Sequence, residues 1–300
     1  MSAPGQRARV SVTHGRHLRV RTLQGEEMAA RPAQRRLRIV CGDWVRVAYD
    51  RQHAEVRVLA VEPRSGTLYR SNARGGGELI AANLSLLLVV FAPLPQPDLF
   101  VVDRYLCAAR SAGIDAQVLL NKCELADESL RAELAVFAAA GYRCLEVSSH
   151  AGIGTQTLRE GLVGQTAMLV GQSGTGKSSL LRALLPGADT TVGPLARDQT
   201  GRHTTTATRL YALPRDAQLL DSPGVRDFAP AIERLPRDTL GFVEIEALAP
   251  ACRFADCLHM QEPDCAVRAA LGTQLAARRY ESYRRLRRLY QRLSSALAQG

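Results

Sequence analysis

One stretch of the sequence has the residue types and spacing needed to hold a phosphate chain. Residues 171–178 fit the pattern G-x-x-x-x-G-K-[ST] in full, after an apolar run at 167–170 and before a helical pattern at 178–185. Its glycines let backbone N–H groups curl around phosphate oxygens, and the helix N-terminus adds partial positive charge. Lys177 can reach the β- and γ-phosphates, and the Ser178 hydroxyl can ligate Mg²⁺. The predicted phosphate-binding residues are Gly171, Gln172, Ser173, Gly174, Thr175, Gly176, Lys177, Ser178 and Ser179.

A second motif could choose the base, which the phosphate loop by itself leaves open between ATP and GTP. Asn121, Lys122 and Glu124 follow an apolar run and resemble the Asn-Lys-x-Asp guanine reader. A carboxylate at the fourth position can accept from both guanine donors, N1–H and the exocyclic amine, whereas adenine has no such pair. Only two of the 39 basic residues are lysines, Lys122 and Lys177, which argues against a chance surface pair. Ser148 and Ser149 follow the next apolar run, where a backbone amide would contact the guanine oxygen.

Two further motifs have the chemistry of a hydrolytic switch. Asp221 and Gly224 fit D-x-x-G after an apolar run, so the carboxylate would hold Mg²⁺ through water and the glycine N–H would sense the γ-phosphate. We expect Thr205, with Thr204 as the alternative, to ligate Mg²⁺ when GTP is bound and to release it afterwards. Val225 stands where many GTPases have a glutamine that orients water.

Because Val225 cannot orient water, another polar group must do so. His203, beside the switch threonines, is our candidate catalytic residue, and Arg202 or a group from a partner is the alternative. A missing glutamine also predicts slow intrinsic hydrolysis that rises when a partner docks.

A cysteine-rich segment near the C-terminus has the composition of a structural zinc site. Cys252, Cys257, His259 and Cys265 supply three thiols and one imidazole within fourteen residues. Four protein ligands fill a tetrahedral zinc sphere, so we expect one structural Zn²⁺ rather than free cysteines.

These residues need elements that position them, and the pattern changes along the chain. Residues 1–75 alternate short strand-like runs with turns, which favours an oligonucleotide-binding (OB)-like barrel over a barrel without a ligand. Its predicted strands are Val10–Val12, Leu18–Thr22, Leu37–Val40, Trp44–Tyr49 and Glu55–Val61. Residues 76–235 alternate strands and helices, which predicts an α/β domain with a mostly parallel sheet. Residues 236–300 read as a helical zinc-binding domain.

Charge is concentrated at the two ends of the chain. The net charge is +10, yet residues 1–80 hold fifteen arginines against seven acidic residues, and residues 278–292 hold seven arginines against Glu281. Such ends favour a nucleic-acid partner over a surface that only aids solubility. No apolar run is long enough to span a membrane, and we expect a cytoplasmic monomer without a membrane partner.

The order of the motifs is a rotation of the usual one. The base reader precedes the phosphate loop, and the D-x-x-G segment leads directly into the C-terminal domain, so nucleotide state could move that domain. A basic barrel, a permuted GTPase domain and a Cys₃His domain together resemble the ribosome small-subunit-dependent GTPase A family. The resemblance implies GTP hydrolysis stimulated by the small ribosomal subunit, contact with its rRNA, a role in late subunit maturation, and Mg²⁺ with GTP or GDP. Two alternatives are a zinc-stabilised RNA-binding protein with a barely hydrolytic site and an ATP-using enzyme.

Overall fold

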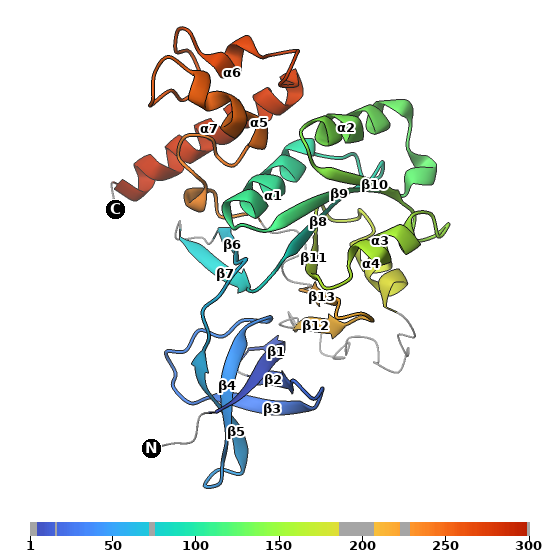
Figure 1. The fold of residues 1–300 in the computed structure, drawn as a ribbon, viewed down its shortest axis with the longest axis vertical. Helices are drawn as coiled ribbons and strands as arrows, with labels where there is room; N and C mark the ends of the chain where they lie inside the picture. The colour runs from blue at the N-terminus through green and yellow to red at the C-terminus, as the bar shows by residue number, and fades with distance from the viewer. Residues whose placement is uncertain (1–4, 16, 72–75, 186–206, 223–228, 299–300) are drawn as a thin grey trace, which may run out of the picture.

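The chain folds into a barrel, a central α/β sheet and a helical C-terminal part, arranged one above the other (Figure 1). The computed structural model describes residues 5–15, 17–71, 76–185, 207–222 and 229–298. In these ranges no helix is long and apolar enough to cross a membrane.

The N-terminal barrel is built from five strands: β1 (Gln6–His14), β2 (His17–Thr22), β3 (Glu27–Pro32), β4 (Trp44–Asp50) and β5 (Glu55–Val61). Pairing runs β1–β2–β3–β5–β4, and a β4–β1 ladder closes it. Small and β-branched side chains alternate inward and form its core, as the period of two requires. They include Ala8, Val10, Val20, Val45, Val47 and Val58.

The predicted strand Leu37–Val40 is wrong, and the third strand is β3 instead. Residues 33–43 form a loop that pairs with β5 and β1 only at its ends, and between them turns and side chains supply hydrogen bonds to its backbone. The Leu37 N–H donates to the Gln34 carbonyl, and the Val40 N–H donates to the Asp43 carboxylate. A run that looks strand-like in sequence is therefore held by turns and by a side chain.

The central domain has parallel strands β10 (Arg143–Val147), β9 (Asp115–Asn121), β8 (Leu86–Phe91), β11 (Thr166–Val170) and β13 (Gln218–Asp221), in that order, and then antiparallel β12 (Thr208–Ala212). All residues of β8 and β11 are buried, because helices cover both faces. Helices α1 (Leu99–Ser111) and α2 (Glu128–Ala139) pack on one face, and α3 (Thr155–Gly161) and α4 (Lys177–Leu184) on the other. The predicted α/β domain is confirmed.

Barrel and central sheet are hydrogen-bonded into one continuous sheet. Val12 and Thr13 of β1 pair with Arg209 and Thr208 of β12. Beside this seam lies buried Arg9, which donates to the carbonyls of Gly42 and Asn83, to Thr166 Oγ1 and to Gln218 Oε1. Burial lowers the pKa of Arg9 to about 10. Arg9 thus ties the barrel to the first residues of β11 and β13.

A hairpin of β6 (Leu68–Ser71) and β7 (Gly77–Ala81) follows the barrel and contacts the segment after the D-x-x-G motif. The Ser71 N–H donates to the Ala229 carbonyl, and the Ala231 N–H donates to the Tyr69 carbonyl. Ser71 Oγ and Arg104 both donate to the Pro230 carbonyl. The exit of that segment is therefore held by the hairpin and by α1.

The C-terminal part contains η2 (Ile232–Arg234), α5 (Val243–Leu248), η3 (Ala249–Ala251), α6 (Ala266–Ala269) and the long α7 (Ala277–Ala298). Its core includes Phe242, Ile245, Tyr283 and Leu286, and it also contains Phe100 and Cys107 of α1. The C-terminal part is thus packed directly on one helix of the central domain.

Candidate nucleotide and metal sites

The phosphate loop lies at the point where the central sheet changes direction. The chain goes from β8 outward to β10 and then returns to β11 on the other side of β8, and the loop follows β11. In open α/β sheets, ligands bind outside the carboxyl ends of the strands at such a point. The position of residues 171–178 therefore suits a bound phosphate chain.

Glycines in the loop are required by its backbone and by close neighbours. Gly171, Gly174 and Gly176 have φ values of 140°, 80° and 88°, which favour glycine. A Cβ on Gly171 would lie 2.0 Å from the Val90 carbonyl oxygen, and one on Gly176 would lie 2.3 Å from Asn121 Nδ2. Any side chain at these positions would collide with β8 or with the base-reader segment.

Lys177 folds back across the loop. Its Nζ donates to the carbonyl oxygens of Gly171 and Gln172, both at 2.6 Å, and the side chain is buried. Thr175 is fully buried, and its Oγ1 donates to the Gln172 carbonyl at 2.9 Å. The ammonium is thus held inside the curl of the loop, where it can meet phosphate oxygens.

The base-reader residues contact the phosphate loop, although they lie about 50 positions earlier in the chain. Asn121 Nδ2 donates to the Thr175 carbonyl at 2.8 Å, and Asn121 Oδ1 is buried without a hydrogen-bond partner among the described residues. Lys122 Nζ donates to the carbonyls of Gly174 and Leu94, at 2.8 and 2.7 Å. The structure brings the two predicted motifs into one site.

Glu124 and the serine segment border this site differently. Glu124 is exposed, in the short helix η1 (Cys123–Leu125). Ser148 is buried, and its Oγ accepts from the Ala151 N–H at 2.9 Å, while its own N–H donates to the Ile153 carbonyl. Ser149 is half-buried beside it. Ser148 therefore shapes the turn after β10.

Part of the predicted switch lies in the described structure. Asp221 ends β13, next to β11, so its carboxylate is at the same edge as the phosphate loop. Buried Ser222 shares a 2.8 Å hydrogen bond between its Oγ and Thr208 Oγ1. That bond joins the D-x-x-G segment to a residue just after the predicted switch threonines. His203, Thr205 and Gly224 lie outside the described residues.

The four predicted metal ligands converge at one point. Their ligand atoms lie within 4.8 Å of one another, and Cys257, His259 and Cys265 are buried. Cys252 Sγ is 3.9 Å from Cys265 Sγ, and His259 Nδ1 is 3.5 Å from each of these sulfurs. Tetrahedral Zn²⁺ with Zn–S of about 2.3 Å would separate two sulfurs by about 3.8 Å. The arrangement is compatible with one zinc ion.

Burial shifts the pKa of two of the four candidate ligands. Burial lowers the pKa of His259, which favours the neutral imidazole that a metal needs. Burial raises the pKa of Cys257 to about 12, so a thiolate there needs a bound cation at neutral pH. Tyr280 and Tyr283 of α7 donate to the carbonyls of His259 and Leu258, both at 2.7 Å, and so hold the loop against the helix.

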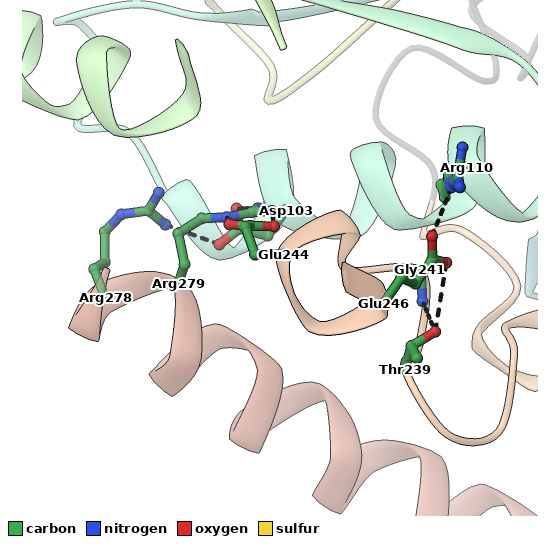
Figure 2. A network of polar contacts seen from close by, with 8 residues as sticks. All are labelled: Asp103, Arg110, Thr239, Gly241, Glu244, Glu246, Arg278 and Arg279. Atoms are coloured by element: carbon green, nitrogen blue, oxygen red, sulfur yellow. Dashed lines mark hydrogen bonds and ion pairs between the residues drawn. The ribbon is translucent and has the colours of Figure 1, made fainter. Parts of the chain in front are cut away.

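Several arginines of α7 bind other segments of the protein rather than facing solvent. Arg279 is buried between Asp103 of α1 and Glu244 of α5, with distances of 2.5 to 2.7 Å, and Arg278 also reaches Asp103 (Figure 2). Burial alone would lower the pKa of Arg279, but the two carboxylates outweigh it and raise the pKa well above its usual value. Arg287 is also buried, against the carbonyls of residues 237 and 238. These three arginines bind other segments of the protein. The sequence suggests that all seven arginines of residues 278–292 could contact a nucleic acid, but these buried or half-buried ones are already engaged.

A parallel contact secures the other end of α5. Arg110 of α1 binds Glu246 at 2.8 Å, and Glu246 also accepts from Thr239, which in turn accepts from the Gly241 N–H (Figure 2). Helix α1 therefore holds the C-terminal part through two ion-paired contacts.

Three contacts at the nucleotide site were not anticipated from sequence. The Leu94 carbonyl holds Lys122, and Pro95 lies so close to Gly174 that a Cβ there would be 3.0 Å from Pro95 Cδ. The Asp98 N–H donates to the Gln172 side chain at 3.1 Å. These contacts use backbone atoms and van der Waals surface, which leave no motif in a sequence.

A phosphate loop with a base reader beside it, in this strand order and between a barrel and a Cys₃His part, defines a circularly permuted GTPase. Comparison with known proteins agrees. Residues 61–230 match the model of the RsgA GTPase family, and the chain belongs to that family.

Similar proteins extend the match over nearly the whole chain. A Small ribosomal subunit biogenesis GTPase RsgA from Ectopseudomonas mendocina is 42% identical over 94% of this chain and 85% of its own. The crystal structure of YjeQ from Thermotoga maritima superposes with a TM-score of 0.75 and 25% identity, covering 95% of this chain and 98% of that one. YloQ, described as a circularly permuted GTPase, shares the fold with a TM-score of 0.70, 19% identity and coverage of 95% of each chain.

Proposed function

We propose that this chain hydrolyses GTP to GDP and phosphate while bound to the small ribosomal subunit, and acts in late maturation of that subunit in the cytoplasm. The observation that carries the proposal is the contact between the base reader and the phosphate loop, Asn121 to Thr175 and Lys122 to Gly174. The name of the E. mendocina relative supplies the ribosomal partner. Residues 1–75, 76–235 and 236–300 would be the barrel, GTPase and zinc domains of a monomer.

Each nucleotide group has a proposed partner. Glu124 would accept from guanine N1–H and its amine, Asn121 and Lys122 would contact the base, and a backbone amide at Ser148 or Ser149 would contact the guanine oxygen. The phosphate loop through Ser179 would hold the α- to γ-phosphates, with Lys177 between the last two. Ser178, Thr205 and, through water, Asp221 would hold Mg²⁺, and Gly224 would sense the γ-phosphate.

The hydrolytic step would use His203 to orient the attacking water, because Val225 cannot. We expect slow hydrolysis alone and faster hydrolysis on the subunit, where docking would fix the switch segments. One Zn²⁺ on Cys252, Cys257, His259 and Cys265 would be structural, since four protein ligands leave no open position.

The deciding experiment titrates the protein with purified small subunits and measures phosphate release from GTP. We expect release to rise with subunit concentration. A matched control is Lys177→Arg, which keeps the charge but places a wide guanidinium where a compact ammonium sits, and we expect it to lose hydrolysis. No stimulation by subunits would refute the ribosomal proposal.

Three smaller tests assign the residues. His203→Ala should remove most of the stimulated rate while leaving GTP affinity unchanged; a full stimulated rate would refute its role. ATP should compete poorly with labelled GTP, and effective competition by ATP would refute guanine selectivity. Glu124→Asp, which shortens the acceptor by one methylene, reports how closely the loop is fitted to the base.

A further inference from the structure

The exposed arginines of the barrel differ in whether a carboxylate lies beside them. Six of the seven arginines on the five strands face carboxylates, the seventh being buried Arg9: Arg7 and Arg46 bind Glu62, Arg19 and Arg21 bind Glu27, and Arg31 and Arg57 bind Glu55. Each of these six guanidinium groups has a carboxylate within 3.4 Å, and the three carboxylates offset half of their positive charge. A partner with negative charge would gain little from these side chains.

The loop between β3 and β4, residues 33–43, is different. Arg35, Arg36 and Arg38 are exposed, and none forms an ion pair with a carboxylate in the part of the chain that the structure describes. Arg36 Nε donates to the Gln34 side chain, an uncharged partner, at 2.8 Å. Three guanidinium groups within four positions thus lack a counter-charge.

Asp43 and Arg64 hold this loop in shape, and we call this pair the clamp. The Asp43 carboxylate is fully buried and accepts from Arg64 Nε and Nη2, at 2.6 and 2.8 Å, and from the Val40 N–H at 2.9 Å. Arg64 also donates to the Arg38 carbonyl. The carboxylate nearest the loop is therefore committed to Arg64 and does not neutralise the three arginines. Fixing the loop beforehand also reduces the entropy lost on binding.

The surroundings of the loop favour a nucleic acid over an acidic protein. Leu37 and Ile39, the apolar residues next to the arginines, are half-buried, and Ile39 packs on the barrel core. Protein interfaces have an apolar or aromatic centre, whereas nucleic-acid interfaces are polar and rich in positive charge. The guanidinium fork also matches the geometry of phosphate oxygens.

We propose that Arg35, Arg36 and Arg38 form the barrel's RNA-contacting surface and bind backbone phosphates of the small-subunit rRNA. This inference rests on the proposed ribosomal function and narrows it to one loop. It leaves the paired arginines of the strands with little part in binding.

The test compares two triple variants with the same change in charge. Arg35→Gln/Arg36→Gln/Arg38→Gln removes the loop charges, and Arg19→Gln/Arg31→Gln/Arg46→Gln removes three paired charges on the strands. Binding to purified small subunits, and to rRNA extracted from them, is measured over a salt series. We expect the loop variant to lose about tenfold or more in affinity and about 2 to 3 units of salt slope, and the strand variant to change far less.

Further measurements keep the outcomes distinct. Arg35→Lys/Arg36→Lys/Arg38→Lys should retain the salt slope, since charge is kept. GTP hydrolysis without subunits should be unchanged in the loop variant, which reports that the nucleotide domain is folded. If the loop and strand variants bind equally, the inference is overturned even where wild-type protein is stimulated by subunits. If the loop variant loses subunit binding but wild-type protein does not bind the extracted rRNA, the partner is an acidic protein and the RNA assignment is wrong.

Discussion

Helix α7 buries some of its arginines, whereas the β3–β4 loop of the barrel exposes all three of its own. On α7, Arg279 and Arg287 are buried and Arg278 is half-buried, committed to carboxylates and carbonyls of other segments. On the barrel, residues 35–38 project three arginines away from the fold. Net charge by segment therefore does not identify a binding surface. What matters is whether each guanidinium already has a carboxylate or carbonyl to bind.

The largest effect that we expect concerns the Cys₃His cluster, whose loop is hydrogen-bonded to α7 and which we propose binds zinc. Removing zinc with a chelator, or replacing Cys257 by Ser, should unfold the loop at 252–265, because structural zinc contributes on the order of 10 kcal/mol. Hydrogen exchange should rise in that loop and in α7, whose tyrosines bind it, and stay constant in the barrel. Metal content should fall from one zinc per chain to none. If hydrogen exchange in α7 stays unchanged, the stability of the helix does not depend on the cluster.

The next effect concerns the buried arginine itself. Arg279→Met leaves Glu244 without Arg279 and leaves Asp103 with Arg278 alone, and breaking a buried ion pair in this way costs about 3 to 5 kcal/mol. Denaturant unfolding measures the loss. Arg284→Met is the matched control on the same helix, since Arg284 pairs with exposed Glu281. If both variants lose the same free energy of unfolding, the buried ion pairs of Arg279 add no more stability than an exposed pair.

A moderate effect is expected at the clamp of the barrel loop. Asp43→Ala removes the acceptor of Arg64 and of the Val40 N–H, and we expect a loss of about 2 kcal/mol, in line with hydrogen bonds to charged groups. Thermal unfolding gives the value, and proteolysis within residues 33–43 should become faster. A stable variant with an unchanged cleavage rate would show that the loop does not depend on the clamp.

The smallest effect belongs to the exposed pairs on the strands. Arg19→Gln breaks a pair with Glu27 whose members are both partly in solvent, so the free energy of unfolding should change by less than about 1 kcal/mol. Chemical denaturation at two salt concentrations checks it. If Arg19→Gln lowers the free energy of unfolding as much as Asp43→Ala does, the distinction between buried and exposed ion pairs is wrong.

How much of the molecule the sequence predicts depends on whether the determinants are contiguous. The phosphate-loop motif is a run of eight residues whose glycines are needed locally, and the four candidate metal ligands, which the structure brings together, lie within fourteen. Both could be found without a structure. Four of the five predicted barrel strands coincide with observed strands, but residues 37–40 form a loop because Asp43 and Arg64 satisfy its backbone.

Long-range pairings could not be predicted in this way. The sequence around Arg279 does not indicate that it binds Asp103, 176 positions earlier. A buried arginine therefore cannot be told from a surface arginine in the sequence. The hairpin of β6 and β7 was also not predicted, and it contains the predicted boundary at residue 75. Its position depends on pairing with residues 229–231, far along the chain.

The ladder between β1 and β12 also determines the order in which strands can pair while the chain is being synthesised. The barrel can close through β1 and β4 once residue 61 has been made, since all its strands are then present. Val12 and Thr13 must wait for residues 208 and 209. At the usual 5 to 20 residues per second, that interval is roughly 7 to 30 s. The first strand to be made is thus among the last to gain all its neighbours.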